Sequence, residues 1–168
     1  MDTVKGINDK LIKRHPHVFG DKKKENSFQT KKDWEAQKHT EKNRSSRLDG
    51  VPSTLPALVR AQRLQEKASY AGFDWEEIDG AWEKLDEELN ELKQAQELGK
   101  IENIKEEIGD VLFSVVNLSR FFNVAAEDML RQSNRKFIRR FKKIEQKLKE
   151  EGKKIEDSTC LLYTSDAA

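Results

Sequence analysis

Apolar residues in this chain recur at the spacing of a helix, and no segment alternates every second residue over the length of a strand. Phe137, Phe141, Ile144 and Leu148 stand at i, i+4, i+7 and i+11, which places them on one face of a helix. The pattern predicts four helices, over residues 55–71, 76–98, 101–122 and 126–150. Because the connections between them are short, we expect an all-α fold, an antiparallel four-helix bundle.

The charge of the chain is nearly balanced, with 32 Lys and Arg against 31 Asp and Glu and a formal net charge of +1. A dedicated nucleic-acid-binding protein usually has a clear basic excess, so this balance argues against that class. No apolar stretch is long enough to span a bilayer, and the N-terminus lacks a signal-peptide hydrophobic region. We therefore expect a soluble, cytoplasmic protein that binds neither nucleic acid nor a membrane.

The chain divides into segments of different composition. Residues 1–21 carry the apolar residues of a short helix that stops before Pro16. Residues 22–50 are polar and rich in Lys, which predicts a solvated linker with at most one weak helix. Pro52 and Pro56 then mark the start of a domain that we expect over residues 51–157.

A first group of acidic residues stands on the second predicted helix. Glu87, Glu88, Glu91 and the basic Lys84 project from one arc of about 100° at the rotation of an α-helix. Glu88 is the member nearest the apolar stripe of this helix. An EExxE motif alone is more often a set of solvated surface acids than a site.

A second pair stands on the third predicted helix. Glu107 and Asp110 are three residues apart, so they are neighbours on the helix surface. They precede residues 111–118, which are apolar nearly all round and are expected to be buried. Carboxylates that meet between two helices repel one another, and Mg²⁺, a hard cation that prefers oxygen ligands, would offset this repulsion.

Histidine and cysteine are absent where a metal site would lie. His15, His17 and His39 all precede residue 40, and the lone Cys160 has no CxxC partner. A metal site in the predicted domain would therefore use oxygen ligands. A di-iron carboxylate bundle, which uses Glu-x-x-His motifs, is disfavoured.

The fourth predicted helix carries a basic pair. Lys136 and Arg140 are four residues apart and flank the aromatic stripe that begins at Phe137. They could bind phosphate oxygens, or they could be the solvated basic face of an amphipathic helix. Carboxylates, a metal and basic groups together are the parts that phosphoryl transfer requires.

Together these motifs resemble the MazG family of nucleoside triphosphate pyrophosphohydrolases. Glu87-Glu88-x-x-Glu91 and Glu107-x-x-Asp110 match its EExxE and ExxD motifs, and residues 134–141 match its basic helix, NxKFxRRF. The resemblance to the family's C-terminal catalytic domain covers residues 51–157 and includes residues 55–58, Gln62, Gln65 and residues 72–75.

The resemblance implies Mg²⁺-dependent hydrolysis of nucleoside triphosphates to the monophosphate and pyrophosphate, usually by a dimer. The metal-binding and catalytic residues would be Glu88, Glu91, Glu107 and Asp110. The nucleotide site would be lined by Lys84, Glu87, Glu106, Lys136 and Arg140. A metal-activated water would attack the α-phosphorus and pyrophosphate would leave.

Both ends of the chain depart from the family pattern. Residues 7–21 resemble the end of the family's N-terminal MazG domain, so we expect residues 1–21 to be an orphan segment without a complete site. The family normally continues after residue 159 into a helix that supplies an aromatic residue near the base. Residues 160–168 instead resemble the translation of a transposase sequencing adapter, and we expect them to be an assembly artefact. The C-terminal MazG domain would then be truncated.

Two other functions stay open at this point. One is a non-catalytic helical dimerisation or interaction module that retains the fold. The other is a related pyrophosphohydrolase that acts on dUTP, dCTP or phosphoribosyl-ATP. The complete EExxE and ExxD motifs favour the triphosphate hydrolase. We expect a homodimer, because four helices leave little surface to cover the apolar third helix.

Overall fold

The computed structural model describes residues 3–14, 32–35 and 45–155. The described residues contain helices and no strands, which confirms the all-α class. The helices are α1 (Thr3–Arg14), a single helical turn at residues 32–35, α4 (Ala57–Tyr70), α5 (Ile78–Leu98), α6 (Ile101–Phe121) and α7 (Ala126–Glu150). The four helices of the predicted domain thus lie within a few residues of their predicted bounds. Most of the expected linker, residues 15–21 and the tail at 160–168 lie outside the described residues.

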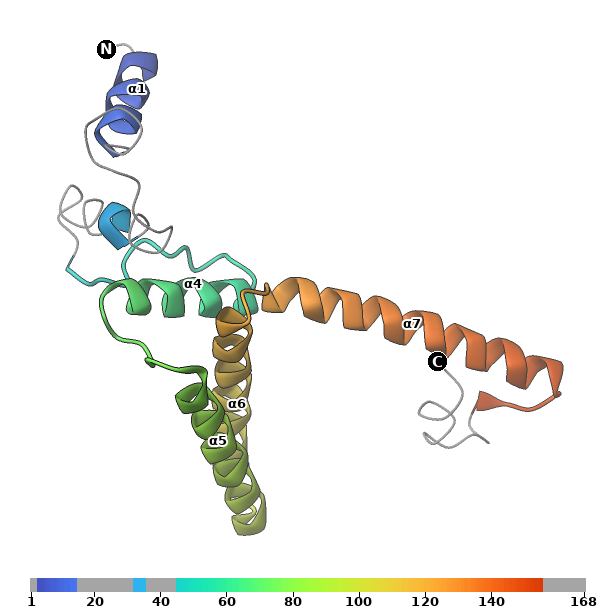
Figure 1. Ribbon diagram of the computed structural model, residues 1–168. Coiled ribbons are helices and arrows are strands. Elements are labelled where there is room, and N and C mark those ends of the chain that lie inside the picture. Colours follow the sequence, from blue (N-terminus) through green and yellow to red (C-terminus); the bar gives the residue numbers. More distant parts are fainter. Residues whose placement is uncertain (1–2, 15–31, 36–44, 156–168) are drawn as a thin grey trace.

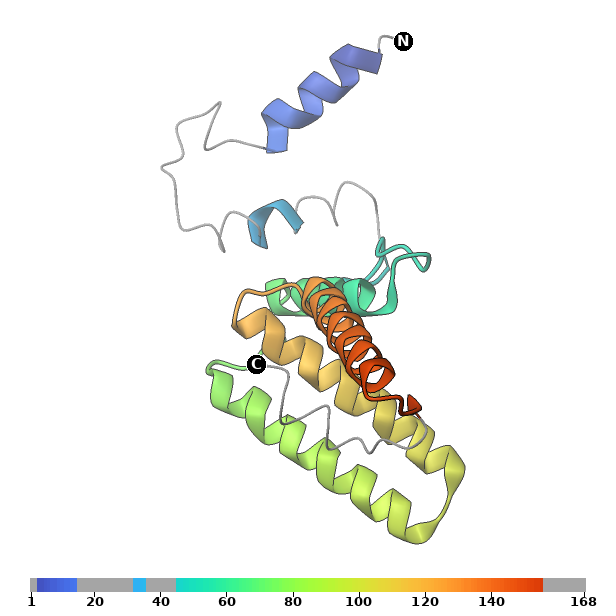
Figure 2. The same ribbon diagram turned by 90° about the vertical axis from the view of Figure 1, so that its right-hand side faces the viewer.

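α5 and α6 form an antiparallel hairpin, and α4 crosses it near the end of α6 (Figures 1 and 2). The core of the hairpin consists of Ala81, Leu85 and Leu118, with partly buried apolar residues around them. The turn between the helices is set by Gly99, whose φ of 66° is the left-handed conformation that ends α5. This hairpin brings the acidic motifs of the two helices to the same level.

The apolar segment of α6 is only partly buried, which corrects the expectation that residues 111–118 are enclosed. Val116 and Leu118 are buried, whereas Leu112, Phe113 and Val115 are 53%, 45% and 46% exposed. The physical reason is that α5 and α4 cover two sides of α6, and no further helix of the described chain covers the rest. A broad apolar face of α6 is therefore open to solvent in the single chain.

α7 leaves the other helices as an arm (Figure 1). Its axis turns by 106° from that of α6, and it packs on α4 and α6 near its first residues. Phe137 and Phe141 stack with ring centroids 6.0 Å apart, yet they are 50% and 38% exposed. The four predicted helices are present, but the fourth does not pack along the other three within one chain.

In the described ranges, no single helix has the length and apolar character of a membrane span. Only α6 and α7 taken together, across their 106° bend, meet those criteria of length and composition.

Candidate metal and nucleotide site

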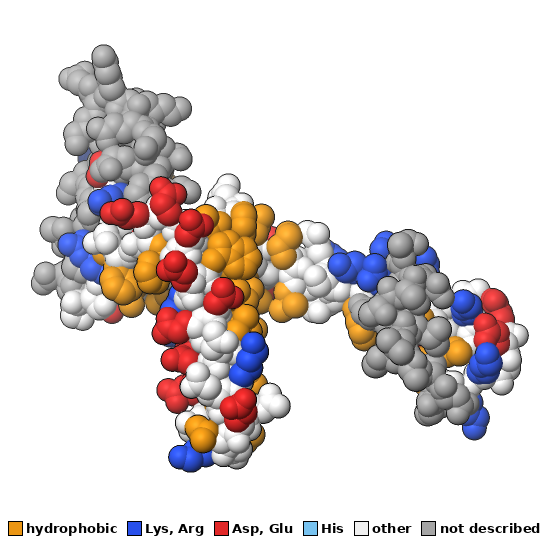
Figure 3. Space-filling model, turned by 60° about the horizontal axis from the view of Figure 1, so that its bottom comes forward, with side chains coloured by type: hydrophobic (Ala, Val, Ile, Leu, Met, Phe, Trp, Pro, Cys, Tyr) orange, Lys and Arg blue, Asp and Glu red, His pale blue; other side chains and the backbone are white. Residues whose placement is uncertain are grey.

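Three of the four predicted metal ligands meet between α5 and α6. One carboxylate oxygen each from Glu88, Glu107 and Asp110 lies within 4.8 Å of the other two. Glu88 is buried, Glu107 is half-buried and Asp110 is exposed, so the group opens from the hairpin toward solvent. Acidic side chains form a row along this hairpin in Figure 3. Three carboxylates at this spacing fit a hard divalent cation such as Mg²⁺.

The Glu107 carboxylate lies among other negative charges. Desolvation, followed by the charges of Glu91, Glu88, Asp110 and Glu106, raises the pKa of Glu107 above its usual value. Neighbouring carboxylates disfavour the ionised form of one another, and a bound cation would reverse that effect. The fourth predicted ligand, Glu91, is exposed on α5 and lies outside the group of three, but its charge acts on Glu107.

Lys84 supplies one positive charge at the edge of the group. Its Nζ lies 2.8 Å from Oε1 of Glu87 and 2.8 Å from Oε1 of Glu88. The hydrogen bonds with Glu87 and Glu88 raise the pKa of Lys84, so the lysine is held in its charged form. The predicted nucleotide-site residues Lys84 and Glu87 are thus beside the carboxylates, and Glu106 is close enough to act on Glu107.

Lys136 and Arg140 are not beside the carboxylates of the same chain. Asp110 is about 16 Å along α6 from the last residue of that helix, and Lys136 is about 15 Å along α7 from its first residue. With the 106° bend between the axes, the separation is on the order of 20 Å. The acidic and the basic parts of the predicted site therefore lie on different arms of one protomer.

Gly109 lies between Glu107 and Asp110 in sequence, where a glycine could permit close approach of a helix or ligand. A Cβ atom added there would meet no described atom within 4 Å. Among the residues that the structure describes, nothing occupies the space beside this position.

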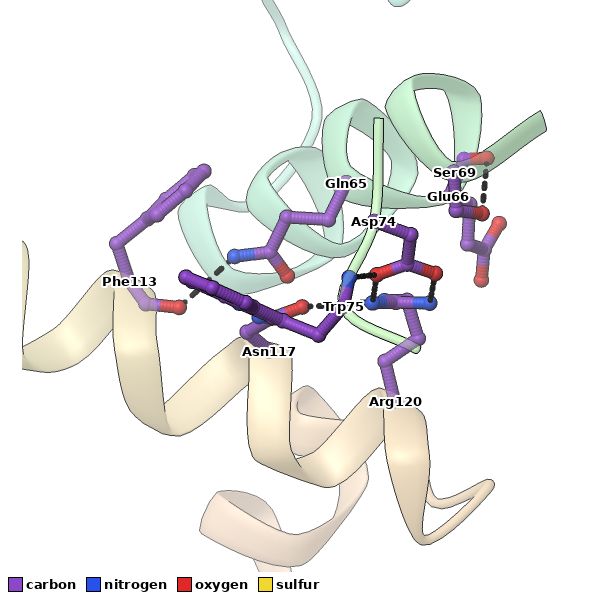
Figure 4. A network of polar contacts seen from close by, with 8 residues as sticks. All are labelled: Gln65, Glu66, Ser69, Asp74, Trp75, Phe113, Asn117 and Arg120. Carbon is purple, nitrogen blue, oxygen red and sulfur yellow. Dashed lines mark hydrogen bonds and ion pairs between the residues drawn. The ribbon is translucent and has the colours of Figure 1, made fainter. Parts of the chain in front are cut away.

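The structure adds residues that the motifs did not single out. Asn117 and Arg120 follow Asp110 on α6, and Arg120 forms a two-pronged ion pair with Asp74 from the connector between α4 and α5 (Figure 4). The available signal was periodicity, because Asn117 stands seven residues after Asp110 and so lies on nearly the same face of the helix.

Comparison with known proteins gives this arrangement a context. Residues 79–145 match the MazG nucleotide pyrophosphohydrolase domain, a range that contains every predicted site residue. The chain is 47% identical over 158 residues to the nucleoside triphosphate pyrophosphohydrolase/pyrophosphatase MazG of Thermotoga maritima, which covers 93% of the chain. It is 41% identical over 152 residues, or 86% of the chain, to the nucleoside triphosphate pyrophosphohydrolase of Escherichia coli K12.

A third relative is the uncharacterized protein YabN of Bacillus subtilis, 46% identical over 159 residues, which amount to 93% of the chain and 32% of YabN. The chain spans 59% and 57% of the length of the Thermotoga and Escherichia relatives. The likeness nevertheless runs through all four helices of the domain and through both acidic motifs. The chain therefore carries a MazG nucleotide pyrophosphohydrolase domain over residues 79–145.

Proposed function

We propose that this chain hydrolyses nucleoside triphosphates to nucleoside monophosphates and pyrophosphate with the help of Mg²⁺. The observation that carries the proposal is the group of Glu88, Glu107 and Asp110, in a chain whose relatives are named for this reaction. In the reaction, the oxygen of water bonds to the α-phosphorus, and the bond to the oxygen that bridges the α- and β-phosphorus breaks. A catalyst needs positive charge at the phosphates, which three carboxylates provide only by holding a cation.

Glu88, Glu107 and Asp110 would hold Mg²⁺, with Glu91 as a further ligand from the same edge of α5. When bound, the ion would neutralise phosphate charge and lower the pKa of a bound water. Lys84 would place its ammonium against a phosphate oxygen while Glu87 keeps it near the site. Glu106 would add to the negative potential that concentrates cations here.

The basic part of the site would come from a second copy of the chain. Lys136 and Arg140 are too far from the carboxylates of their own protomer, and their helix is an amphipathic arm with exposed Phe137 and Phe141. The uncovered face of α6, with Leu112 and other apolar residues, offers a matching surface. A homodimer in which each α7 approaches the acidic hairpin of its partner buries both faces and joins opposite charges.

We further propose the extent of the catalytic unit and its location in the cell. The catalytic unit would be residues 51–157, with residues 1–21 outside it, and the location would be the cytoplasm. A related substrate such as dUTP, dCTP or phosphoribosyl-ATP is the second candidate. The same carboxylates would serve each of them, because the metal contacts the phosphates and not the base.

The test is release of pyrophosphate from a panel of ribo- and deoxyribonucleoside triphosphates with Mg²⁺. We expect Glu88→Gln to reduce the rate by at least about 100-fold, as loss of an electrostatic catalytic group does. Glu83→Gln, an exposed acid on another face of α5, is the matched control and should retain the rate. Undiminished release by Glu88→Gln would remove Glu88 from the mechanism. Absence of release by the wild-type chain would favour the non-catalytic dimerisation module.

A further inference from the structure

Charge is distributed unevenly along this chain. Residues 129–144 of α7 contain seven Lys and Arg and no Asp or Glu, whereas residues 78–121 of the α5–α6 hairpin contain eleven Asp and Glu against five Lys and Arg. Figure 3 shows acidic side chains along the hairpin and basic side chains on the arm that α7 forms. The formal net charge of +1 is thus the sum of regions of opposite sign, and it does not exclude binding of a polyanion by α7 alone.

Four of these basic residues form one face of α7, which we call the outer basic face. At the rotation of an α-helix they lie about 140–240° around the axis from Phe137, on the side opposite the apolar stripe. The basic pair proposed for the nucleotide site lies between the two faces, at about 260° and 300°. The residues of the outer basic face are Arg135, Arg139, Lys142 and Lys143.

The charges of the outer basic face are exposed and are not offset by nearby acids. All four residues are exposed, and in the described part of the chain no ion pair joins any of them to a carboxylate. One turn earlier, by contrast, Nη2 of Arg131 lies 2.8 Å from Oε1 of Glu127. Like charges four residues apart on a helix, such as Arg135 and Arg139, repel each other. An anion bound from solution would relieve this repulsion.

The spacing of these charges fits a chain of phosphates. Arg135, Arg139 and Lys143 follow one another at intervals of four residues, so they are separated by about 6 Å along the axis of α7. A nucleic-acid strand carries one negative charge per nucleotide, and a single strand is flexible enough to follow a line of cations on a protein surface.

Other acidic partners fit this face less well. A helix binds an anionic membrane through its apolar face, but the apolar stripe of α7 lies on the opposite side. A protein–protein interface has an apolar core that is poor in charge, whereas the residues between the four cations are the polar Gln132 and Gln146.

We propose that the outer basic face of α7 binds the sugar–phosphate backbone of a single-stranded nucleic acid. Arg135 and Arg139 donate paired hydrogen bonds to phosphate oxygens, and the ammonium groups of Lys142 and Lys143 act as point charges. Because the contacts are to phosphates, binding does not depend on base sequence. The acidic group between α5 and α6 takes no part, so this interaction is additional to the proposed hydrolysis.

The experiment measures fluorescence anisotropy of a labelled DNA single strand of about 20 nucleotides, titrated with the full chain at NaCl concentrations from about 50 to 200 mM. One triple variant removes three charges from the outer basic face: Arg135→Gln, Arg139→Gln and Lys142→Gln. The matched control removes three exposed lysines from the hairpin and changes the net charge equally: Lys93→Gln, Lys100→Gln and Lys105→Gln. Pyrophosphate release from a nucleoside triphosphate is measured for both variants.

We expect the α7 variant to lose at least about tenfold in affinity for the strand at the lowest salt concentration. Its plot of log Kd against log salt concentration should be shallower by about 2, because each phosphate contact on a single strand contributes about 0.7 to the slope. The hairpin variant should bind the strand nearly as the wild type does, and both variants should retain pyrophosphate release.

Three results would overturn the proposal. The first is equal loss of strand binding in both variants, or no loss in the α7 variant. The second is loss of pyrophosphate release in the α7 variant, which would place these residues in the hydrolytic site. The third is a wild-type chain that binds vesicles of phosphatidylglycerol and phosphatidylcholine but not the strand, which would make the ligand a membrane. A wild-type chain that binds the strand but releases no pyrophosphate would overturn only the proposed hydrolysis.

Discussion

The ammonium group of Lys84 lies 2.8 Å from Oε1 of the buried Glu88, the innermost carboxylate of the acidic group. The Lys84 ammonium therefore already neutralises part of the charge of the Glu88 carboxylate. A metal ion at Glu88 would have to share that carboxylate with Lys84, and the two positive charges would repel each other.

Removing this competitor should strengthen metal binding. We expect Lys84→Met to bind Mn²⁺ or Mg²⁺ about three- to tenfold more tightly in the absence of nucleotide, because partly exposed charge pairs contribute energies of this order. Isothermal titration of the metal into the metal-free protein measures the change. Lys105→Met, which removes an exposed ion pair with Glu102 on α6, is the control and should leave metal affinity unaltered. Equal or weaker binding by Lys84→Met would contradict a competition for Glu88.

Glu107 should lower the stability of the metal-free chain. Its pKa is raised from the ordinary 4.5, chiefly by desolvation and then by the surrounding carboxylates. Between pH 4.5 and the higher pKa of the folded state, the folded chain therefore binds more protons than the unfolded chain. The free energy of unfolding falls as the pH rises through this range, and it stops falling above the folded-state pKa. We expect Glu107→Gln to raise the metal-free melting temperature at neutral pH and to flatten this pH dependence, while metal binding weakens. Differential scanning calorimetry with EDTA tests this expectation, and a lower melting temperature would contradict it.

If α7 of one copy completes the site of another, two inactive variants should complement each other. Glu88→Gln damages the acidic hairpin and Lys136→Met damages the arm, so a mixed dimer retains one site built from two intact halves. We expect about a quarter of wild-type pyrophosphate release after the variants are unfolded together and refolded at equal concentrations. A mixture of Glu88→Gln with Glu107→Gln, both in the same half, should show no recovery. Absence of recovery in the first mixture would argue against sharing of the site between copies.

Two glycines should respond in opposite directions to alanine. At Gly80 the added methyl group would meet the Trp75 ring at 2.7 Å, so we expect Gly80→Ala to cost about 1–3 kcal/mol in the free energy of unfolding. At Gly109 the methyl group meets no described atom within 4 Å, and alanine should stabilise α6 by up to about 1 kcal/mol. Urea unfolding at low protein concentration measures both. Destabilisation by Gly109→Ala would indicate that another surface approaches α6 at this point.

The corner between α6 and α7 depends on Asn123, which has a φ of 55°. Backbone hydrogen bonds from Asn123 and Val124 to carbonyls of α6 close the turn. Asparagine tolerates this left-handed conformation, whereas a β-branched residue does not. We expect Asn123→Val to cost about 1–2 kcal/mol and Asn123→Gly to be nearly neutral, as measured by urea unfolding. A neutral valine variant would show that the corner is not fixed by this residue.

The sequence was sufficient for the helices and for the acidic group, because both depend on local spacing. Glu107 and Asp110 are neighbours on any helix, and the short turn at Gly99 brings them level with Glu88. The direction of α7 was not predictable, since periodicity describes the faces of a helix and says nothing about the angle at its first residue. The exposure of one face of α6 could not be predicted for the same reason. The apolar pattern predicts that another surface covers this face, but it does not say which chain supplies that surface.

The polar contacts that α4 and the following connector make with α6 could not be predicted, for another reason. Gln65 and the carbonyl of Phe113 are 48 positions apart, and the ion pair of Asp74 with Arg120 spans 46 positions. Contacts of this range depend on how α4 crosses α6, which no short motif encodes. The resemblance placed Gln65 and residues 72–75 in a family pattern, but only the structure connects them to Asn117.

The hydrogen-bonded corner at Asn123 has a consequence for assembly. Its closed turn presents α7 at a set angle before any partner is met, so little backbone freedom at the corner remains to be lost when two copies associate. A rigid turn of this kind favours one relative orientation of the two copies over many. Inserting a few glycines at the corner would make the connection between α6 and α7 flexible. The exposed apolar face of α7 would then be free to pack on its own chain or to link many chains into an open-ended oligomer.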